Sequence, residues 1–130
     1  MERMEEEVIN IGSIVLRWSD WFSWDELKAD ARYGGVSIPN YESGVYEVKH
    51  KDTEERLTIG KTSNLRMRIK EGLVRGKIPH STGEKIRVKE DVSKLVIRWT
   101  VTDRPAAVEE ELHRRYRDKF GGLPKYTERT

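Results

Sequence analysis

Basic side chains are concentrated in one short stretch of this chain, between residues 61 and 77. The stretch holds six basic residues against the single acid Glu71, although the net charge of all 130 residues is only +2. Clustered lysine and arginine side chains are typical of surfaces that bind nucleic-acid phosphates, and an ordinary solvated face is the alternative. The six basic residues are Lys61, Arg66, Arg68, Lys70, Arg75 and Lys77.

Arg68 and Glu109 have the chemical character that hydrolysis of a phosphodiester requires. Such a reaction needs an activated water, neutralisation of charge on the phosphate and help for the leaving oxygen. A guanidinium is always charged and offers two N–H groups to a phosphate, and a carboxylate can take one face of a Mg²⁺ ion. Arg68 adjoins the apolar stripe Leu65–Ile69 and Glu109 adjoins Val108–Leu112, so both are expected at the edge of the core. Taken singly, Arg68 is typical of a solvated arginine on an amphipathic helix, and Glu109 is typical of a charge in a first helical turn.

Gly60-Lys61-Thr62 looks like the end of the phosphate-binding loop of an NTPase. That motif requires a glycine five positions before Gly60, and this chain has Glu55 there. Four residues between strand and helix also leave too little chain to wrap a triphosphate. These residues therefore exclude an NTPase.

Alternating apolar residues predict a β-hairpin and a helix around the basic stretch. Residues 44–50 and 56–59 alternate and are separated by a short polar segment, which predicts two antiparallel strands. Ser63 is expected to cap a helix that ends near Gly76. A polar loop is predicted over residues 77–85.

A third strand and a long helix are predicted in the last third of the chain. Residues 94–102 alternate as a strand does. Asp103 is expected to cap the last helix, with Pro105 in its first turn and Gly121-Gly122 at its end. The predicted fold is therefore α+β, with a small three-stranded antiparallel sheet flanked by helices. The buried stripe of the last helix should consist of Val108, Leu112, Tyr116 and Phe120.

Residues 1–42 are predicted to form an N-terminal extension of a domain at residues 43–130. A strand over residues 11–18 precedes a helix that starts at the capping box Ser23–Glu26 and ends at Gly34-Gly35. The core of this extension is expected to contain three tryptophans, for which a DNA contact or a dimer surface is the alternative. They are Trp18, Trp21 and Trp24.

The order and spacing of several short motifs resemble the GIY-YIG nuclease module. Gly44-Val45-Tyr46 resembles the first strand motif of the family and Thr58-Ile59-Gly60 the second. Residues of the following turn and helix also stand at the spacing of the family: Lys61, Asn64-Leu65 and Arg68.

The resemblance continues to the end of the chain. Glu109-Glu110-Glu111-Leu112, preceded by Ala106-Ala107, resembles the last helix of the module, and Pro124-Lys125-Tyr126-Thr127 resembles its closing segment. The likeness therefore covers residues 43–127. No single motif is specific, but five in this order and spacing rarely coincide.

The resemblance implies a DNA endonuclease that hydrolyses phosphodiester bonds with one Mg²⁺ or Mn²⁺ per active site. Glu109 would bind the metal, Arg68 would hold the scissile phosphate, and Tyr46 would orient or deprotonate the water. Lys61 would lower the pKa of the tyrosine or contact phosphate, because a tyrosine base has a reference pKa of about 10. The substrate would be duplex or branched DNA, and the protein a monomer or a homodimer. Contacts with the DNA are assigned to Lys61, Asn64, Arg66, Lys70, Arg75 and Lys77.

Two positions depart from the pattern of the family. The second tyrosine is Thr58, which keeps a hydroxyl but loses the reach of the ring, so His80 is the candidate for a replacement base. The closing asparagine is Thr127, which removes a hydrogen bond expected to position the site. A DNA-binding protein of this fold with weakened catalysis is therefore the alternative, and a protein-interaction domain using the Trp-rich segment is a third hypothesis. His50 and His113 are expected on the surface.

The composition excludes several classes of protein. There is no cysteine, so disulfides, thiolate metal ligands and a cysteine nucleophile are excluded. No apolar run approaches the roughly 20 residues that a membrane span requires. The segment Met1–Glu7 is acidic where a secretory signal would be basic. A cytoplasmic location without a membrane partner is expected.

Overall fold

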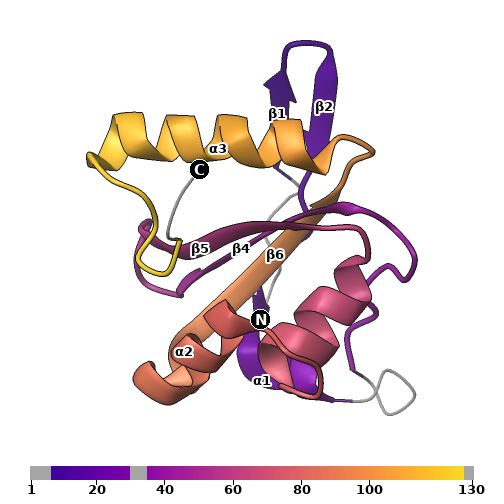
Figure 1. Cartoon of the computed structure of the whole chain (residues 1–130), viewed down its shortest axis with the longest axis vertical. Coiled ribbons are helices and arrows are strands. Elements are labelled where there is room, and N and C mark those ends of the chain that lie inside the picture. The colour runs from indigo at the N-terminus through magenta and orange to yellow at the C-terminus, as the bar shows by residue number, and fades with distance from the viewer. Residues whose placement is uncertain (1–6, 30–34, 128–130) are drawn as a thin grey trace.

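The computed structural model describes residues 7–29 and 35–127. It is a mixed α+β fold with two antiparallel sheets and several helices (Figure 1), which confirms the predicted fold class. The main sheet has the strand order β3-β6-β4-β5, and the smaller sheet is the hairpin β1-β2. None of the helices in the described ranges is long and apolar enough to cross a membrane.

Three seven-residue strands form most of the main sheet: β4 (Gly44–His50), β5 (Arg56–Thr62) and β6 (Leu95–Val101). β4 lies between the other two and pairs antiparallel with both. The sheet contains one strand that was not predicted, the two-residue β3 (Phe22–Ser23), which pairs with β6. In this order β5 forms one edge of the sheet. It runs three residues beyond its predicted end at residue 59.

The N-terminal segment corrects two predictions. In place of one strand over residues 11–18, the chain forms a hairpin of β1 (Val8–Ile11) and β2 (Ile14–Arg17). Gly12 turns the chain between them at φ 57°, a conformation that glycine adopts without strain. Helix α1 (Trp24–Lys28) starts at the predicted capping box and already ends at Lys28. Part of its predicted continuation, residues 30–34, lies outside the described residues.

The helical segments that follow the hairpin also differ in part from the prediction. The predicted helix near residue 65 is a π-helical segment, η2 (Met67–Val74), whose N-cap is Arg66 rather than Ser63. The Asn64 side chain accepts a hydrogen bond from the Met67 N–H at its start. The predicted loop over residues 77–85 is wrong, because helix α2 (Ser81–Lys89) starts within it. A short 3-10 turn, η3 (Val92–Lys94), then leads into β6.

The last helix, α3 (Pro105–Phe120), has the predicted length and ends at Gly121. Its N-cap is Arg104, without a side-chain hydrogen bond, so the prediction that Asp103 caps it was wrong. Val108 and Leu112 are buried, whereas Tyr116 and Phe120 at its far end are only half-buried.

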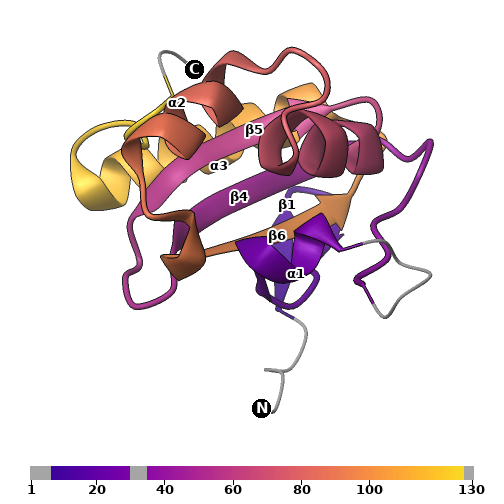
Figure 2. The ribbon, with the colours of Figure 1, turned by 90° about the horizontal axis from the view of Figure 1, so that it is seen from below.

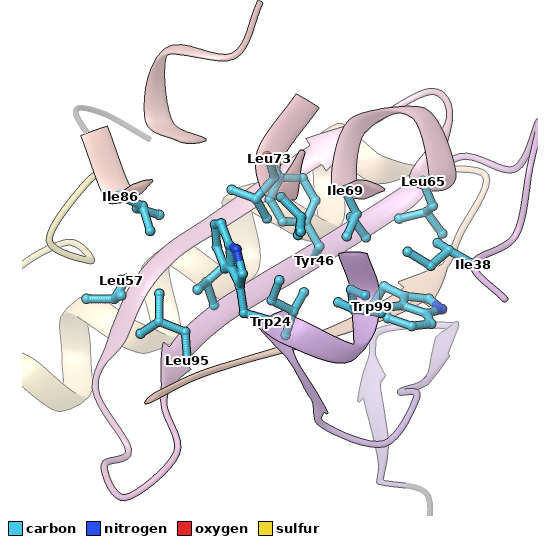
Figure 3. Packing of buried hydrophobic residues seen from close by; sticks show 14 of the residues in the cluster. Trp24, Ile38, Tyr46, Leu57, Leu65, Ile69, Leu73, Ile86, Leu95 and Trp99 are labelled. Atoms are coloured by element: carbon cyan, nitrogen blue, oxygen red, sulfur yellow. The ribbon is translucent and has the colours of Figure 1, made fainter. Parts of the chain in front are cut away.

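Both faces of the main sheet are covered, as Figure 2 shows with α1 and α2 on the near side and α3 behind. The larger hydrophobic cluster lies among α1, η2, α2 and the sheet and includes Tyr46, Trp24 and Trp99 (Figure 3). The smaller cluster joins Leu16 and Trp18 to residues of β4, β5 and α3. Residues from the predicted extension therefore contribute to both clusters, and they share these clusters with residues 43–127.

Candidate functional site

A pocket of about 550 Å³ opens along the edge strand β5. Its walls come from both faces of the sheet, because α3 contributes from one side and η2 and the start of α2 contribute from the other. All six catalytic residues predicted from the sequence line this pocket. They are Tyr46, Thr58, Lys61, Arg68, His80 and Glu109; the remaining lining residues are Ile59, Gly60, Ser81, Thr82, His113, Tyr126 and Thr127.

Tyr46 is held in the wall of the pocket by its packing against the neighbouring strand. The residue is only 4% exposed and lies directly opposite Gly60 in the β4–β5 ladder. A Cβ atom at Gly60 would lie 2.5 Å from the Tyr46 Oη, so the tyrosine ring occupies the space that any other residue at position 60 would need. Burial, opposed by the charge of Arg68 and aided by that of Glu109, raises the pKa of Tyr46 to about 12. The hydroxyl is therefore protonated at neutral pH.

His80 links Tyr46 to the start of α2. Its Nδ1 accepts a hydrogen bond from the Gly83 N–H at 2.7 Å, which caps the helix, and its Nε2 lies 3.1 Å from the Tyr46 Oη. Because Nδ1 accepts, we assign the proton of the neutral ring to Nε2, which then donates to the tyrosine oxygen. Burial, with Arg68 and Arg87 acting in the same direction, lowers the pKa of His80 to about 4, so the ring is neutral at pH 7.

This arrangement corrects the role predicted for His80. A general base needs a lone pair that is free to accept a proton from water. In His80 one ring nitrogen accepts from Gly83 and the other carries the proton. The neutral ring can therefore donate a hydrogen bond to Tyr46 and stabilise negative charge on the tyrosine oxygen. It has no free lone pair with which to act as a base in place of the second tyrosine, the position that Thr58 occupies.

Three charged side chains of the pocket form no ion pair within the described residues. Arg68 and Glu109 are half-buried and Lys61 is exposed. Across residues 7–29 and 35–127, none of these three side chains forms a hydrogen bond or an ion pair. By contrast, Glu111 on the same helix as Glu109 forms ion pairs with Arg114 and Arg115. Charges that the fold leaves uncompensated in a pocket are available to a charged ligand.

The donor set of the pocket suits a hard divalent cation. Glu109 contributes a carboxylate without a cationic partner in the described part of the chain. No cluster of three or more histidine, aspartate or glutamate side chains that could hold a metal occurs among the described residues. A cation bound at Glu109 would thus keep most of its ligands from water or from substrate oxygens, as Mg²⁺ commonly does in sites that act on phosphates.

The two departures from the motif pattern meet in space. Thr58 stands where the second tyrosine was expected and Thr127 where the asparagine was expected, and their Oγ1 atoms are 3.3 Å apart. The closing segment is also joined to β5 by a backbone hydrogen bond from Tyr126 to Leu57 at 2.8 Å. A threonine pair therefore holds the closing segment against the pocket, at the place where larger side chains were expected.

Two of the predicted DNA contacts have structural roles instead. Lys70 is 3% exposed, and its Nζ donates to the backbone oxygen of Ala29 at 2.7 Å. The guanidinium of Arg75 donates to the backbone oxygen of Lys28 and to Glu71. Both residues tie η2 to the end of α1 and lie outside the pocket. Assigning them to a DNA surface was wrong, because spacing along a helix does not reveal which cations its neighbours cover.

The other predicted contacts are placed differently. Lys61 lines the pocket, whereas Arg66 is half-buried and Lys77 exposed outside it. Asn64 is engaged within the protein, because its Oδ1 accepts from the Met67 N–H at 3.3 Å and its Nδ2 donates to Asn40 at 3.1 Å.

His113 lines the pocket and is buried, so the prediction that it lies on the surface was wrong. It is only 1% exposed, and its Nε2 lies 2.9 Å from the backbone oxygen of Ile59. The available signal was its position four residues after Glu109, because residues four apart share one face of a helix. His50 is partly exposed and lies 3.0 Å from Glu90.

The chain matches no protein-family model, no curated protein and no solved structure with which it was compared.

Proposed function

We propose that this protein is a metal-dependent DNA endonuclease whose active site is the pocket beside β5. The main support is that the six side chains predicted from the family resemblance and its departures lie together. They come from β4, β5, η2, α3 and the residue before α2, yet all of them line one pocket. Further support comes from Arg68, Lys61 and Glu109, whose charges have no partner within the described residues.

The side chains divide the work of phosphodiester hydrolysis between them. Arg68 binds oxygens of the scissile phosphate, because its guanidinium is always charged and makes paired hydrogen bonds. Lys61, on the adjoining strand, adds a second positive charge. A divalent cation held by Glu109 would supply the positive charge that stabilises the leaving oxygen.

Tyr46 orients the attacking water in this proposal. Because His80 donates to the tyrosine oxygen, the hydroxyl proton of Tyr46 is free to point into the pocket. When the hydroxyl is deprotonated, the same bond from His80 stabilises the phenolate. Arg68 acts in the same direction, because it lowers the pKa of Tyr46.

Cleavage of supercoiled plasmid in the presence of Mg²⁺ or Mn²⁺ tests the proposal. Wild type is expected to nick or linearise the DNA, and Arg68→Ala to be slower by roughly 10²–10³-fold, the usual loss when one stabilising group is removed. Arg117→Ala is the matched control, since Arg117 is exposed on α3 and lies outside the pocket. Equal activity of wild type and Arg68→Ala would locate the site elsewhere. If neither plasmid nor branched DNA were cleaved, the endonuclease proposal would be wrong.

The variant His80→Asn distinguishes the hydrogen bond that caps α2 from the hydrogen bond to Tyr46. Asparagine is a good helix cap but is too short to reach Tyr46, so stability is expected to change by less than about 1 kcal/mol. The cleavage rate is expected to fall by roughly 10–10²-fold, because a hydrogen bond to a charged group contributes about 1.5–3 kcal/mol. Thermal unfolding and the nicking rate measure the two effects. A full wild-type rate in His80→Asn would show that the bond to Tyr46 has no part in the reaction.

A DNA-binding protein with weakened catalysis is the second candidate. Two observations favour it: Thr58 replaces an expected tyrosine, and burial raises the pKa of Tyr46 to about 12, far above neutral pH. This candidate predicts retention of DNA without cleavage, with affinity that falls steeply as salt rises. An interaction surface built from the tryptophans has less support, because Trp18 and Trp24 are both buried.

A further inference from the structure

Glu109 and His113 form a pair on one face of α3. They are four residues apart on a continuous helix, so their side chains are neighbours on its surface. Both residues line the pocket beside β5. Glu109 has no hydrogen-bond or ion-pair partner in the described ranges.

The hydrogen bonding of His113 determines which of its nitrogens carries the proton. Its Nε2 lies 2.9 Å from the backbone oxygen of Ile59, and a carbonyl oxygen can only accept. Nε2 therefore donates, and the lone pair of the neutral ring is on Nδ1. This Nδ1 is buried and has no hydrogen-bond partner among the described residues. Buried polar atoms normally have a partner, so a ring nitrogen without one requires an explanation.

A role as a metal ligand would account for both ring nitrogens of His113, the bonded Nε2 and the unpartnered Nδ1. Histidines that bind metals usually donate their other ring N–H to a carboxylate or a backbone carbonyl, which fixes the tautomer and orients the ring. His113 has this arrangement toward Ile59, with a carboxylate one helical turn away in the same pocket. Nδ1 is covered by protein atoms, so a cation reaches it only when the side chains around it move.

We propose that Glu109 and Nδ1 of His113 together hold the divalent cation, which makes the site selective for a transition metal such as Mn²⁺ over Mg²⁺. Imidazole nitrogen binds first-row transition metals well, whereas Mg²⁺ prefers oxygen ligands. Two protein ligands leave the other coordination positions to water and to a phosphate oxygen. The inference rests on the proposed function for the role of the cation, but metal binding is measurable without DNA.

Isothermal titration of the full chain with Mn²⁺, Co²⁺ or Mg²⁺, in the absence of DNA, tests the site. Wild type is expected to bind Mn²⁺ and Co²⁺ at least about tenfold more tightly than Mg²⁺. His113→Gln keeps an N–H for Ile59 but lacks the ring nitrogen, so it should lose that preference and retain weak Mg²⁺ binding. His113→Leu serves as a second variant in case the glutamine disturbs folding, which circular dichroism checks. The visible spectrum of bound Co²⁺ should change in both variants, because one nitrogen ligand is lost.

His50→Gln is the matched control, because His50 lies 3.0 Å from the carboxylate of Glu90 and outside this pocket. It should bind Mn²⁺ and Co²⁺ as wild type does. Equal Mn²⁺ affinity in wild type and both His113 variants would overturn the proposed site, as would a preference of wild type for Mg²⁺. If either of these binding results were found and plasmid was still cleaved, the endonuclease proposal would stand without this metal site. The expected metal binding without any cleavage would instead support the site and contradict the endonuclease proposal.

Discussion

Glu109→Gln is expected to slow DNA cleavage by roughly 10²–10³-fold while leaving the fold intact. The amide has the size of the carboxylate but not its charge, so it holds a divalent cation far more weakly. Because Glu109 has no ion-pair partner within the described residues, its neutralisation leaves no buried cation without a partner. Stability is therefore expected to change by less than about 0.5 kcal/mol, as for most partly exposed positions. The nicking rate at fixed Mn²⁺ and the midpoint of thermal unfolding measure the two effects.

The neighbouring residue provides the control for Glu109. Glu110→Gln removes the same charge from an exposed position one residue further along α3, outside the pocket. It is expected to cleave at the wild-type rate. An equal loss in both variants would indicate a general effect of negative charge near the start of α3, and an unchanged rate in Glu109→Gln would exclude this carboxylate from the reaction.

Gly60→Ala is expected to damage both stability and activity, although it adds a single methyl group. The new Cβ would lie 2.5 Å from the Tyr46 Oη and 2.6 Å from its Cζ, both far inside contact distance. The ring is buried in the larger cluster and bonded to His80, so it cannot move aside without losing these contacts. Overpacking of this kind costs roughly 1–3 kcal/mol. Displacement of the hydroxyl should also reduce cleavage by at least about tenfold, since catalytic geometry tolerates small displacements poorly.

Denaturant unfolding separates this clash from an ordinary effect of glycine. The backbone at Gly60 is outside the left-handed region, so alanine is not strained there by its φ angle. Gly122→Ala is the control, because a Cβ at that position has nothing within 4 Å. In a Tyr46→Leu background Gly60→Ala should cost much less, and the difference is the interaction free energy of the pair. An equal cost in both backgrounds would show that the ring is not what excludes a side chain.

Local sequence patterns were sufficient for the parts of the fold that repeat regularly. Strict alternation predicted β4, β5 and β6, and the helical stripe through Val108 and Leu112 predicted α3. The six candidate catalytic residues follow from the resemblance of short motifs and from the departures from it, and all six line one pocket, but their catalytic role stays a prediction. The strands and the helix could be predicted because each depends on residues that are neighbours in sequence or stand at a regular spacing.

Helix α2 could not be predicted from such patterns. Gly83 lies inside it, and glycine is a poor helix former, so the local sequence favours a loop. The helix forms because His80 caps it and Gly83 packs closely: a Cβ at Gly83 would lie 3.0 Å from His80 Nδ1 and 3.0 Å from Leu73 Cα. Close approach of η2 selects the small residue, and this contact between segments has no signature in the local pattern.

Residue types and their order along the chain establish which side chains are available for chemistry, whereas packing in the folded chain sets what each of them can do. Lys70 and Arg68 are similar as cations on one helical stretch, yet the first is buried against Ala29 and the second faces the pocket. Histidines 80 and 113 have the same side chain, but their hydrogen-bond partners leave a free lone pair only on the second. The physical reason is that charge, hydrogen bonding and burial depend on neighbours brought from distant parts of the chain, whereas residue type and spacing do not.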